Sequence, residues 1–233
     1  MSAGQAVFLV GGRGSRLGEL TAETPKPLLP VAGRPFIEHL LDKAVREGFD
    51  DLILSAGYRH EALEGYVGRW RGAALRLSVE PEPLDTAGAV AHALPLLDDQ
   101  FLLVNGDTWF DFDWRGLGLS EGLSGMVAAR EVSPADRYET LDVEGGRVVA
   151  IRPRAALVSG VINGGVYRFR RDVFAGVHGR VSLEKDTLPR LCARGVLGAE
   201  IKDGDFVDIG LPHSLAAAEQ VAGLARPSQP WVR

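Results

Sequence analysis

The chain has 233 residues, of which 45% are hydrophobic and 24% charged, and its formal net charge is −5. These proportions are ordinary for a globular protein, and the negative charge argues against non-specific binding of nucleic acid. We see no apolar stretch long enough to span a membrane and no basic segment of a signal peptide. The single cysteine, Cys192, cannot form an intramolecular disulfide. We therefore expect a cytoplasmic protein that binds neither nucleic acid nor a membrane.

A glycine-rich segment follows the first apolar run of the chain. The run covers residues 7–10, short enough for a buried strand, and Gly-Gly-Arg-Gly-Ser-Arg follows at residues 11–16. A glycine-rich turn at the end of a strand exposes several backbone N–H groups. Together these groups form a concave site for an anion, most often a phosphate. The two arginines add positive charge in a fork that can hold a phosphate with two hydrogen bonds. Lys26 follows between two prolines, which fix the backbone on both sides of it. This segment therefore predicts a phosphate-binding site.

Two common phosphate-binding motifs do not fit this segment. The Walker pattern requires a Lys-Ser or Lys-Thr pair after the glycines, and the segment has neither. The dinucleotide pattern G-x-G-x-x-G fails at its third glycine position, which is Leu17. A β-turn with two solvated arginines is the structural alternative to a phosphate site.

The pattern G-G-x-G-[ST]-R-L, followed shortly by P-K-P, resembles the signature of the sugar-1-phosphate nucleotidylyltransferases. The resemblance implies that the glycine-rich loop wraps the nucleotide phosphates. It also implies catalytic roles for Arg16, which contacts these phosphates, and for Lys26, which contacts them and the incoming sugar phosphate. The chain has Val10 where alanine is more usual in the family. The implied nucleotide-binding residues of the loop are Gly11, Gly12, Gly14 and Ser15.

The first part of the chain predicts alternating strands and helices. Residues 35–47 show helical spacing of apolar side chains, with Pro at the first position and Gly48 as a stop. Strands are expected at residues 51–55 and 75–79, with a second helix at residues 60–70 between them. This order implies a parallel sheet with helices on its faces. In such sheets ligands bind beyond the carboxyl ends of the strands, which is where the glycine-rich loop lies.

Glu80 ends the third expected strand and is a candidate for recognition of the base. The resemblance places base recognition here and in the following helix, expected to run through Leu97, where small residues such as Gly88 let the base lie flat. A carboxylate only accepts hydrogen bonds, and guanine offers N1–H and N2–H₂ side by side as donors. Uracil and thymine place their imide N–H between two carbonyls, which repel a carboxylate. Glu80 therefore favours guanine; the alternatives are that Glu82 reads the base, or that Glu80 is solvated or pairs with an arginine.

An apolar strand at residues 101–104 ends in Asn105-Gly106-Asp107. Mg²⁺ prefers oxygen ligands, typically one or two carboxylates together with substrate phosphates, so Asp107 is a candidate metal ligand. A second apolar segment, at residues 205–210, delivers Asp208 next to a glycine. The resemblance makes Asp107 and Asp208 the two carboxylates that bind Mg²⁺, and it places Asn105 at the sugar phosphate. The structural alternative is that Asp107 caps a turn.

The second half of the chain predicts further strands and two helices. Residues 138–143 alternate in polarity, Gly-Gly follows at 145–146, and residues 147–151 return, which predicts an antiparallel hairpin and hence a mixed sheet. Ser182 is the expected N-cap of a helix, and a final helix is expected at residues 212–222. The resemblance implies sugar-phosphate contacts from Arg152, where relatives often carry lysine, and from Asn163, Gly164 and Glu184.

The resemblance covers roughly residues 6–222. Within the family, the segments Ser-Leu-Glu-Lys-Asp, Ile-Asn-Gly-Gly-Val-Tyr and Phe-Val-Asp-Ile-Gly are most similar to the D-glycero-α-D-manno-heptose-1-phosphate guanylyltransferases. The implied fold is α/β: one Rossmann-like domain over residues 1–233 of the nucleotide-diphospho-sugar transferase type, with a mixed, mostly parallel sheet flanked by helices. Its nucleotide-binding half would cover about residues 1–110, and its sugar-phosphate-binding half about residues 111–225.

The implied activity is Mg²⁺-dependent, in-line attack of a sugar 1-phosphate on the α-phosphate of an NTP, with release of pyrophosphate. GTP and the heptose 1-phosphate are the favoured substrates, in the biosynthesis of nucleotide-sugars for cell-surface polysaccharides. The N-acetylmuramate-1-phosphate uridylyltransferases and the mannose-1-phosphate guanylyltransferases share the first loop and N-G-D. A non-catalytic subunit that senses a nucleotide-sugar is an alternative of another class, as is a glycosyltransferase that uses Asp111 and Asp113. A monomer and a homodimer are both compatible with the sequence.

Overall fold

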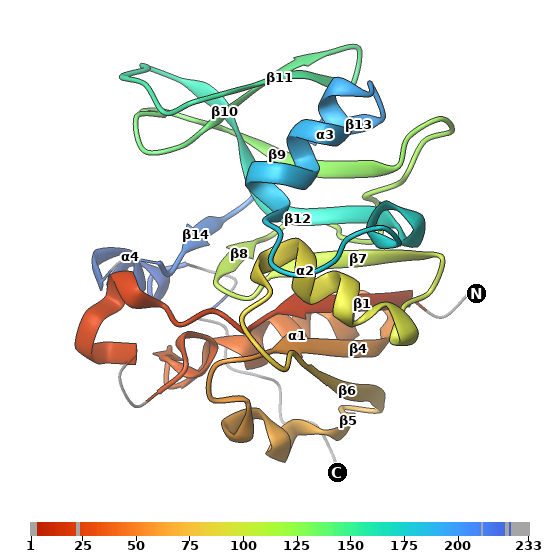
Figure 1. Cartoon of the computed structure of the whole chain (residues 1–233). Coiled ribbons are helices and arrows are strands. Elements are labelled where there is room, and N and C mark those ends of the chain that lie inside the picture. The colour runs from red at the N-terminus through yellow and green to blue at the C-terminus, as the bar shows by residue number, and fades with distance from the viewer. Residues whose placement is uncertain (1–3, 22–23, 211, 222–223, 225–233) are drawn as a thin grey trace. The chain divides into compact units, whose positions relative to one another are not determined.

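The computed structural model describes residues 4–21, 24–210, 212–221 and 224, and the chain divides into two compact units. The first unit consists of Met1–Pro83, Asn105–Asp111 and Gly204–Arg233, and the second of Leu84–Val104 and Phe112–Asp203. Each unit contains both helices and strands, which are labelled in Figure 1.

Parallel strands form the main sheet of the first unit. The strands β1 (Gly4–Leu9), β4 (Phe49–Ala56) and β6 (Ala73–Val79) pair in parallel, and β5 (Gly68–Trp70) pairs antiparallel with β6. Helix α1 (Phe36–Arg46) packs on β4 with its apolar face buried (Figure 1). Strands covered in this way are apolar along their length, which is why β1 and β4 were recognisable in the sequence. The expected helix at residues 35–47 and the strands at 51–55 and 75–79 are confirmed.

The prediction of an α-helix at residues 60–70 is wrong. A 3₁₀ helix covers His60–Tyr66, and Gly68–Trp70 form the edge strand β5. Leu63 is the one buried side chain of that 3₁₀ helix, so the segment has no apolar stripe to hold an α-helix on the sheet. Gly68 has φ 121°, a conformation that favours glycine and interrupts the helix.

Several short elements complete the first unit. They are a 3₁₀ helix at Ser15–Thr21, a 3₁₀ turn at Lys26–Leu28, the hairpin of β2 (Pro30–Val31) and β3 (Arg34–Pro35), the ribbon of β8 (Thr108–Phe110) and β14 (Phe206–Asp208), and α4 (Pro212–Ala218). The ribbon is antiparallel and joins two segments that are far apart in the sequence. The final helix expected at residues 212–222 is confirmed over α4, and Ala222 lies outside the described residues.

Antiparallel pairing predominates in the sheet of the second unit. Its strands are β7 (Gln100–Asn105), β9 (Gly125–Val132), β10 (Thr140–Glu144), β11 (Arg147–Arg152), β12 (Gly160–Arg170) and β13 (Leu197–Ile201). Their order is β10-β11-β13-β9-β12-β7, and the β9–β13 pair is parallel. The expected hairpin is confirmed as β10 and β11, with Gly145 and Gly146 at φ 55° and 77°, as a tight hairpin turn requires. The sheet is therefore mixed, as the sequence predicted.

The helices of the second unit are short. They are α2 (Asp85–His92), a 3₁₀ turn at Leu94–Leu96, another at Arg171–Phe174, a π-helical turn at Leu183–Thr187 and α3 (Leu188–Ala193), which packs on β11 and β13. The Ser182 hydroxyl accepts a hydrogen bond from the Lys185 N–H, so the expected N-cap is confirmed. The helix expected through Leu97 ends earlier, because Pro95 cannot donate to the helical ladder.

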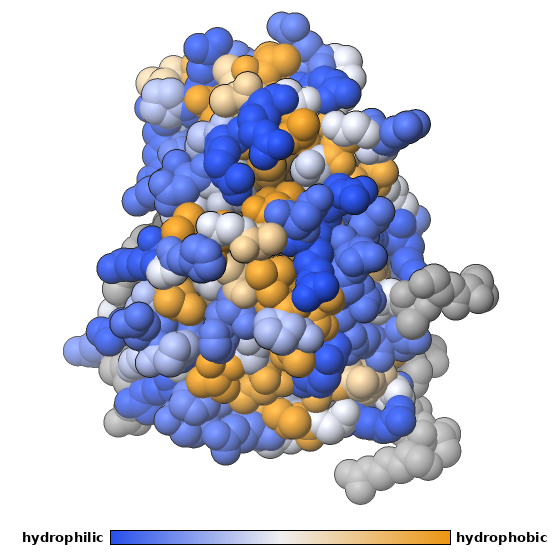
Figure 2. Space-filling model, turned by 45° about the vertical axis from the view of Figure 1, so that its right-hand side comes forward, coloured by the Kyte–Doolittle hydropathy of each residue, from blue (hydrophilic) through white to orange (hydrophobic). Residues whose placement is uncertain are grey.

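None of the described helices is long and apolar enough to cross a membrane. Figure 2 shows hydrophobic residues in small groups among hydrophilic ones on the face that it draws. Such scattered exposure is normal for a folded chain and needs no partner to explain it.

His39 on α1 gives the stability of the fold a pH dependence. The side chain is 5% exposed, and its Nε2–H donates to the Val31 carbonyl at 2.9 Å. Burial lowers the pKa of His39. The unfolded chain then binds a proton near the ordinary histidine pKa of about 6.5, while the folded chain resists it, so stability falls as the pH drops below that value.

We expect this loss to be at most about 1.4 kcal/mol between pH 6.5 and 5.5, and to be absent in His39→Gln. Urea unfolding of both proteins at pH 7.5, 6.5 and 5.5 measures it. An identical pH dependence in the two proteins would show that His39 does not titrate in this range.

Asp42 is the centre of a buried ionic network in the first unit. Its side chain is 7% exposed and accepts hydrogen bonds from Arg34 at 2.9 Å, from Trp70 Nε1 at 2.9 Å and from Arg71 Nη2 at 3.0 Å. It therefore links α1 to β3 and to the turn after β5. Removing one partner of a buried charge pair costs about 3–5 kcal/mol.

Asp42→Asn should lower the free energy of unfolding by about 3 kcal/mol, the low end of that range, because both arginines are partly exposed. Urea unfolding checks this, with the exposed Asp50→Asn as a control expected to stay within about 0.5 kcal/mol. Equal effects of the two substitutions would contradict a structural role for the network.

Candidate functional site

The carboxyl ends of the three parallel strands of the first unit are tied together by backbone hydrogen bonds. Gly11 follows β1, Gly57 follows β4, and Glu80 follows β6. The bonds run from Val10 N to Ser55 O at 2.9 Å, from Tyr58 N to Gly11 O at 3.2 Å, and from Glu80 N to Ala56 O at 2.9 Å. The glycine-rich loop and Glu80 therefore lie at one edge of one sheet, where α/β proteins bind their ligands.

The glycine-rich loop is held closed by Gly14. Gly14 has φ 63°, and a Cβ there would lie 2.9 Å from Thr21 Cγ2 and 3.1 Å from Lys26 Cβ. Its carbonyl accepts from the Thr21 hydroxyl at 3.1 Å and from the Leu17 N–H at 2.9 Å. A Cβ at Gly12 would meet nothing within 4 Å, so that part of the loop is open. The side chains of Ser15 and Arg16 lie outside the described part of the chain.

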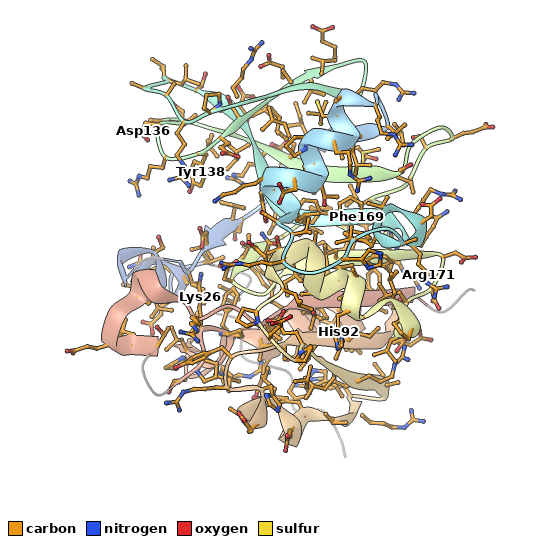
Figure 3. All side chains as sticks on the ribbon, in the orientation of Figure 1. Lys26, His92, Asp136, Tyr138, Phe169 and Arg171 are labelled. Atoms are coloured by element: carbon orange, nitrogen blue, oxygen red, sulfur yellow. The ribbon has the colours of Figure 1, made fainter. Side chains whose placement is uncertain are left out.

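Lys26 brings together three residues that the sequence singled out separately. Its Nζ donates to Asp107 Oδ2 and lies 3.9 Å from Asp208 Oδ1. Lys26 is 7% exposed as a residue, whereas each carboxylate is 32% exposed. Lys26, which is labelled in Figure 3, lies in the chain between β1 and β2. A buried ammonium therefore faces two carboxylates that remain accessible to a ligand.

The β8–β14 ribbon positions the two aspartates next to each other. Thr108 pairs with Asp208 across the ribbon, and the Ile209 N–H donates to the Asp107 carbonyl at 2.9 Å. Each carboxylate is then oriented locally: Asp107 Oδ1 accepts from the Thr108 hydroxyl at 3.1 Å, and Asp208 Oδ1 accepts from the Gly210 N–H at 2.7 Å. Backbone pairing, rather than side-chain packing alone, sets their separation.

Gly106 ties this ribbon to β1. Its N–H donates to the Leu9 carbonyl at 3.0 Å, and a Cβ on Gly106 would lie only 2.4 Å from that oxygen. The glycine of the Asn-Gly-Asp motif therefore allows a close backbone approach that any side chain would prevent. The Oδ1 atom of neighbouring Asn105 is buried and has no hydrogen-bond partner among the described residues.

Lys43 braces the far end of the ribbon, and the sequence analysis did not identify it. It is 3% exposed, and its Nζ donates to Asp111 Oδ1 at 2.9 Å and to Glu47, with the Trp109 ring 5.7 Å away. Asp111, which a glycosyltransferase would use, is therefore held by an ion pair at the end of the ribbon. One signal in the sequence could have identified Lys43 as a buried residue. It lies three residues after Leu40, and so on the apolar face of the expected helix.

The donor set of the two aspartates fits a hard divalent cation. Among the described residues no cluster of three or more His, Cys, Asp or Glu side chains could hold a metal ion. Mg²⁺ is usually bound by one or two carboxylates together with water and substrate phosphates, not by an all-protein cage. Asp107 and Asp208 match that pattern in ligand type and number.

Five of the sequence-predicted residues lie in the second unit, and four of them are held there by contacts within that unit. A Cβ on Gly88 would lie 2.4 Å from the Gly179 carbonyl, so Gly88 is required for packing. Glu184 Oε2 accepts from the Thr86 hydroxyl at 2.9 Å. The Asn163 side chain donates to Tyr167 Oη and accepts from the Gly165 N–H. It lies beside a bulge in β12 that includes Gly164. The exposed Arg152 forms an ion pair with Asp142 at 2.7 Å. Their predicted substrate contacts stay predictions.

Comparisons with known proteins identify the family and relatives of this chain. The family model described as nucleotidyl transferase matches residues 5–222. The D-glycero-alpha-D-manno-heptose 1-phosphate guanylyltransferase of Aneurinibacillus thermoaerophilus is 33% identical over 93% of this chain and 97% of its own length. The mannose-1-phosphate guanyltransferase of Gibberella zeae is 31% identical over 89% of this chain and 61% of its own length.

The crystal structure of HddC from Yersinia pseudotuberculosis complexed with GMP-PN is also similar, with a TM-score of 0.82 at 28% identity over 93% of this chain and 98% of that chain. This likeness confirms the α/β fold of the nucleotide-diphospho-sugar transferase type that the sequence predicted. With the family model matching nearly the whole chain, the chain belongs to the nucleotidyl transferase family.

Proposed function

We propose that the chain joins GTP and D-glycero-α-D-manno-heptose 1-phosphate to give the GDP-sugar and pyrophosphate. The observation that carries the proposal is the contact of Lys26 with Asp107 and Asp208 in the unit that holds the glycine-rich loop. The names of the relatives support the substrates, since guanylyltransferases for heptose and mannose 1-phosphates align over most of the chain. A phosphate oxygen of the sugar 1-phosphate forms a bond to the α-phosphorus of GTP. The bond between the α-phosphorus and the oxygen that bridges to the β-phosphate breaks, and pyrophosphate leaves with that oxygen.

The chemistry needs positioning more than proton transfer. The attacking phosphate oxygen is already anionic, so no general base is required. The amides of Gly11, Gly12 and Gly14 and the side chain of Arg16 are assigned to the departing pyrophosphate, whose negative charge they offset. Lys26 holds and orients the phosphates. Asp107 and Asp208 would hold Mg²⁺, which neutralises phosphate charge when it is bound.

Substrate selection is assigned to polar side chains and glycines that the sequence singled out. Glu80 at the sheet edge reads guanine through N1–H and N2–H₂. Gly88 is proposed to contribute to nucleotide binding, and Asn105, whose Oδ1 is buried without a partner among the described residues, is assigned to the sugar phosphate. The remaining sugar-phosphate contacts are assigned to Arg152, Asn163, Gly164 and Glu184.

The proposed reaction belongs to nucleotide-sugar biosynthesis in the cytoplasm and supplies activated sugars for cell-surface polysaccharides. Uridylyl transfer to N-acetylmuramate 1-phosphate and guanylyl transfer to mannose 1-phosphate remain the alternatives within the family. A silent sensing subunit is disfavoured because Arg16, Lys26, Asp107 and Asp208 are all present.

The substrate assignment is tested by pyrophosphate release with Mg²⁺. GTP, UTP, dTTP, CTP and ATP are each paired with heptose, mannose, glucose and N-acetylmuramate 1-phosphates. We expect the highest kcat/KM for GTP with the heptose phosphate. Turnover with UTP and N-acetylmuramate 1-phosphate would keep the chemistry and overturn the substrates, and silence of every pair would favour the sensing subunit.

The role of Lys26 is tested by Lys26→Met, which removes the ammonium and keeps the length of the side chain. We expect kcat/KM to fall by about 10²–10³-fold, the effect of losing one preorganised electrostatic contact. Mg²⁺ should bind the substrate-free variant more tightly than the wild type, because no ammonium competes for the two carboxylates. Thermal unfolding against Mg²⁺ concentration measures this binding, and Asp107→Asn in the same background should abolish it.

An Asp107→Ala or Asp208→Ala enzyme with full activity would remove the metal from the proposal.

A further inference from the structure

The side chain of Glu80 lies directly against two glycines of neighbouring strand ends. A Cβ built on Gly57 would lie 2.1 Å from Glu80 Oε1 and 2.9 Å from both its Cδ and Cγ. A Cβ on Gly11 would lie 3.0 Å from the same Oε1. The carboxylate therefore occupies the volume that a side chain at residue 57 would take.

Gly57 is needed for this space and not for its backbone conformation. It is absent from the residues with positive φ, so its φ and ψ are open to other residues. Its neighbour contributes to the edge as well, because the Tyr58 N–H donates to the Gly11 carbonyl at 3.2 Å. An alanine at position 57 is therefore compatible with the chain path, provided that Glu80 turns away.

We propose that Gly57 is a positioning residue for base selection, which acts by leaving room for the Glu80 carboxylate in the position from which it faces the base. The inference rests on the proposed function, in which Glu80 reads guanine. An added methyl group at position 57 collides with Cγ as well as with the carboxylate, so the whole side chain must rotate. Glu80 can make that rotation about its own side-chain bonds, whereas recognition of two adjacent donors depends on where its carboxylate lies.

Guanine and hypoxanthine report the position of the carboxylate. GTP offers both N1–H and N2–H₂ to Glu80, while ITP lacks the exocyclic amine and offers N1–H alone. A carboxylate that is correctly placed gains one more charge-assisted hydrogen bond with GTP. We expect the wild-type enzyme to favour GTP over ITP by about 10- to 100-fold in kcat/KM.

The experiment measures kcat/KM for GTP and ITP, with the same sugar 1-phosphate, in matched variants. Glu80→Ala and Gly57→Ala should each reduce the GTP/ITP ratio to within about threefold of unity. The double variant should show no further change, because Gly57 acts through Glu80. Gly65→Ala is the control: Gly65 lies in the 3₁₀ helix His60–Tyr66, is exposed, has an ordinary φ, and its Cβ would meet nothing within 4 Å. This control should keep the wild-type ratio.

The outcomes separate the inference from the proposed function. A wild-type ratio in Gly57→Ala overturns the role of Gly57 alone, provided that Glu80→Ala loses the ratio. A wild-type ratio in Glu80→Ala overturns both the base reader and the inference, and a wild-type enzyme that releases no pyrophosphate overturns the proposed function.

Folding of the variants supplies an independent check. If Gly57→Ala does not fold, Glu80→Ala in the same chain should restore the wild-type unfolding temperature, since it removes the clashing side chain. Failure of that rescue would show that Gly57 serves the fold and would overturn the inference.

Discussion

The site depends on a buried ammonium held between two carboxylates. Taking the Lys26 ammonium out of water is costly unless opposite charge lies close to it, and Asp107 and Asp208 supply that charge. The carboxylates in turn owe their separation to the β8–β14 ribbon, which Lys43 anchors through Asp111. A second buried lysine thus stabilises the element that positions the partners of the first. Both ion pairs lie in one unit, so the framework and the chemical groups are parts of the same packed structure.

Glycines set how closely the strand ends approach one another. Gly106 lets the segment after β7 reach the carbonyl of Leu9, and Gly11 and Gly57 make room for Glu80. In each case a methyl group would displace a backbone or a carboxylate that the site uses. These positions have different reasons for being glycine, since Gly14 also needs φ 63° whereas Gly57 needs only space. The open edge of the sheet is therefore built largely by the absence of side chains.

The sequence predicted those parts of the fold whose signals are local. Continuous apolar runs marked β1 and β4, helical spacing marked α1, and the Gly-Gly pair marked the β10–β11 hairpin. The prediction for residues 60–70 was wrong because the 3₁₀ helix there has one buried residue, Leu63. One buried residue gives no periodic pattern by which an α-helix could be told from a turn and an edge strand. Gly57 and Lys43 were missed because their partners, Glu80 and Asp111, are brought near only by the fold. The resemblance implied separate roles for Lys26 and for the two aspartates, but not the contacts between them, because no spacing in the chain encodes those contacts.

The charge of the site explains why a divalent cation is the expected companion of a phosphate substrate. One ammonium faces two carboxylates, so the three side chains together carry negative charge and would repel a triphosphate. In the proposed function, a divalent cation held by Asp107 and Asp208 would offset that charge where the phosphates bind. The ammonium of Lys26 limits the repulsion between the two carboxylates, and with the acids neutralised by the cation it would be available to the phosphates.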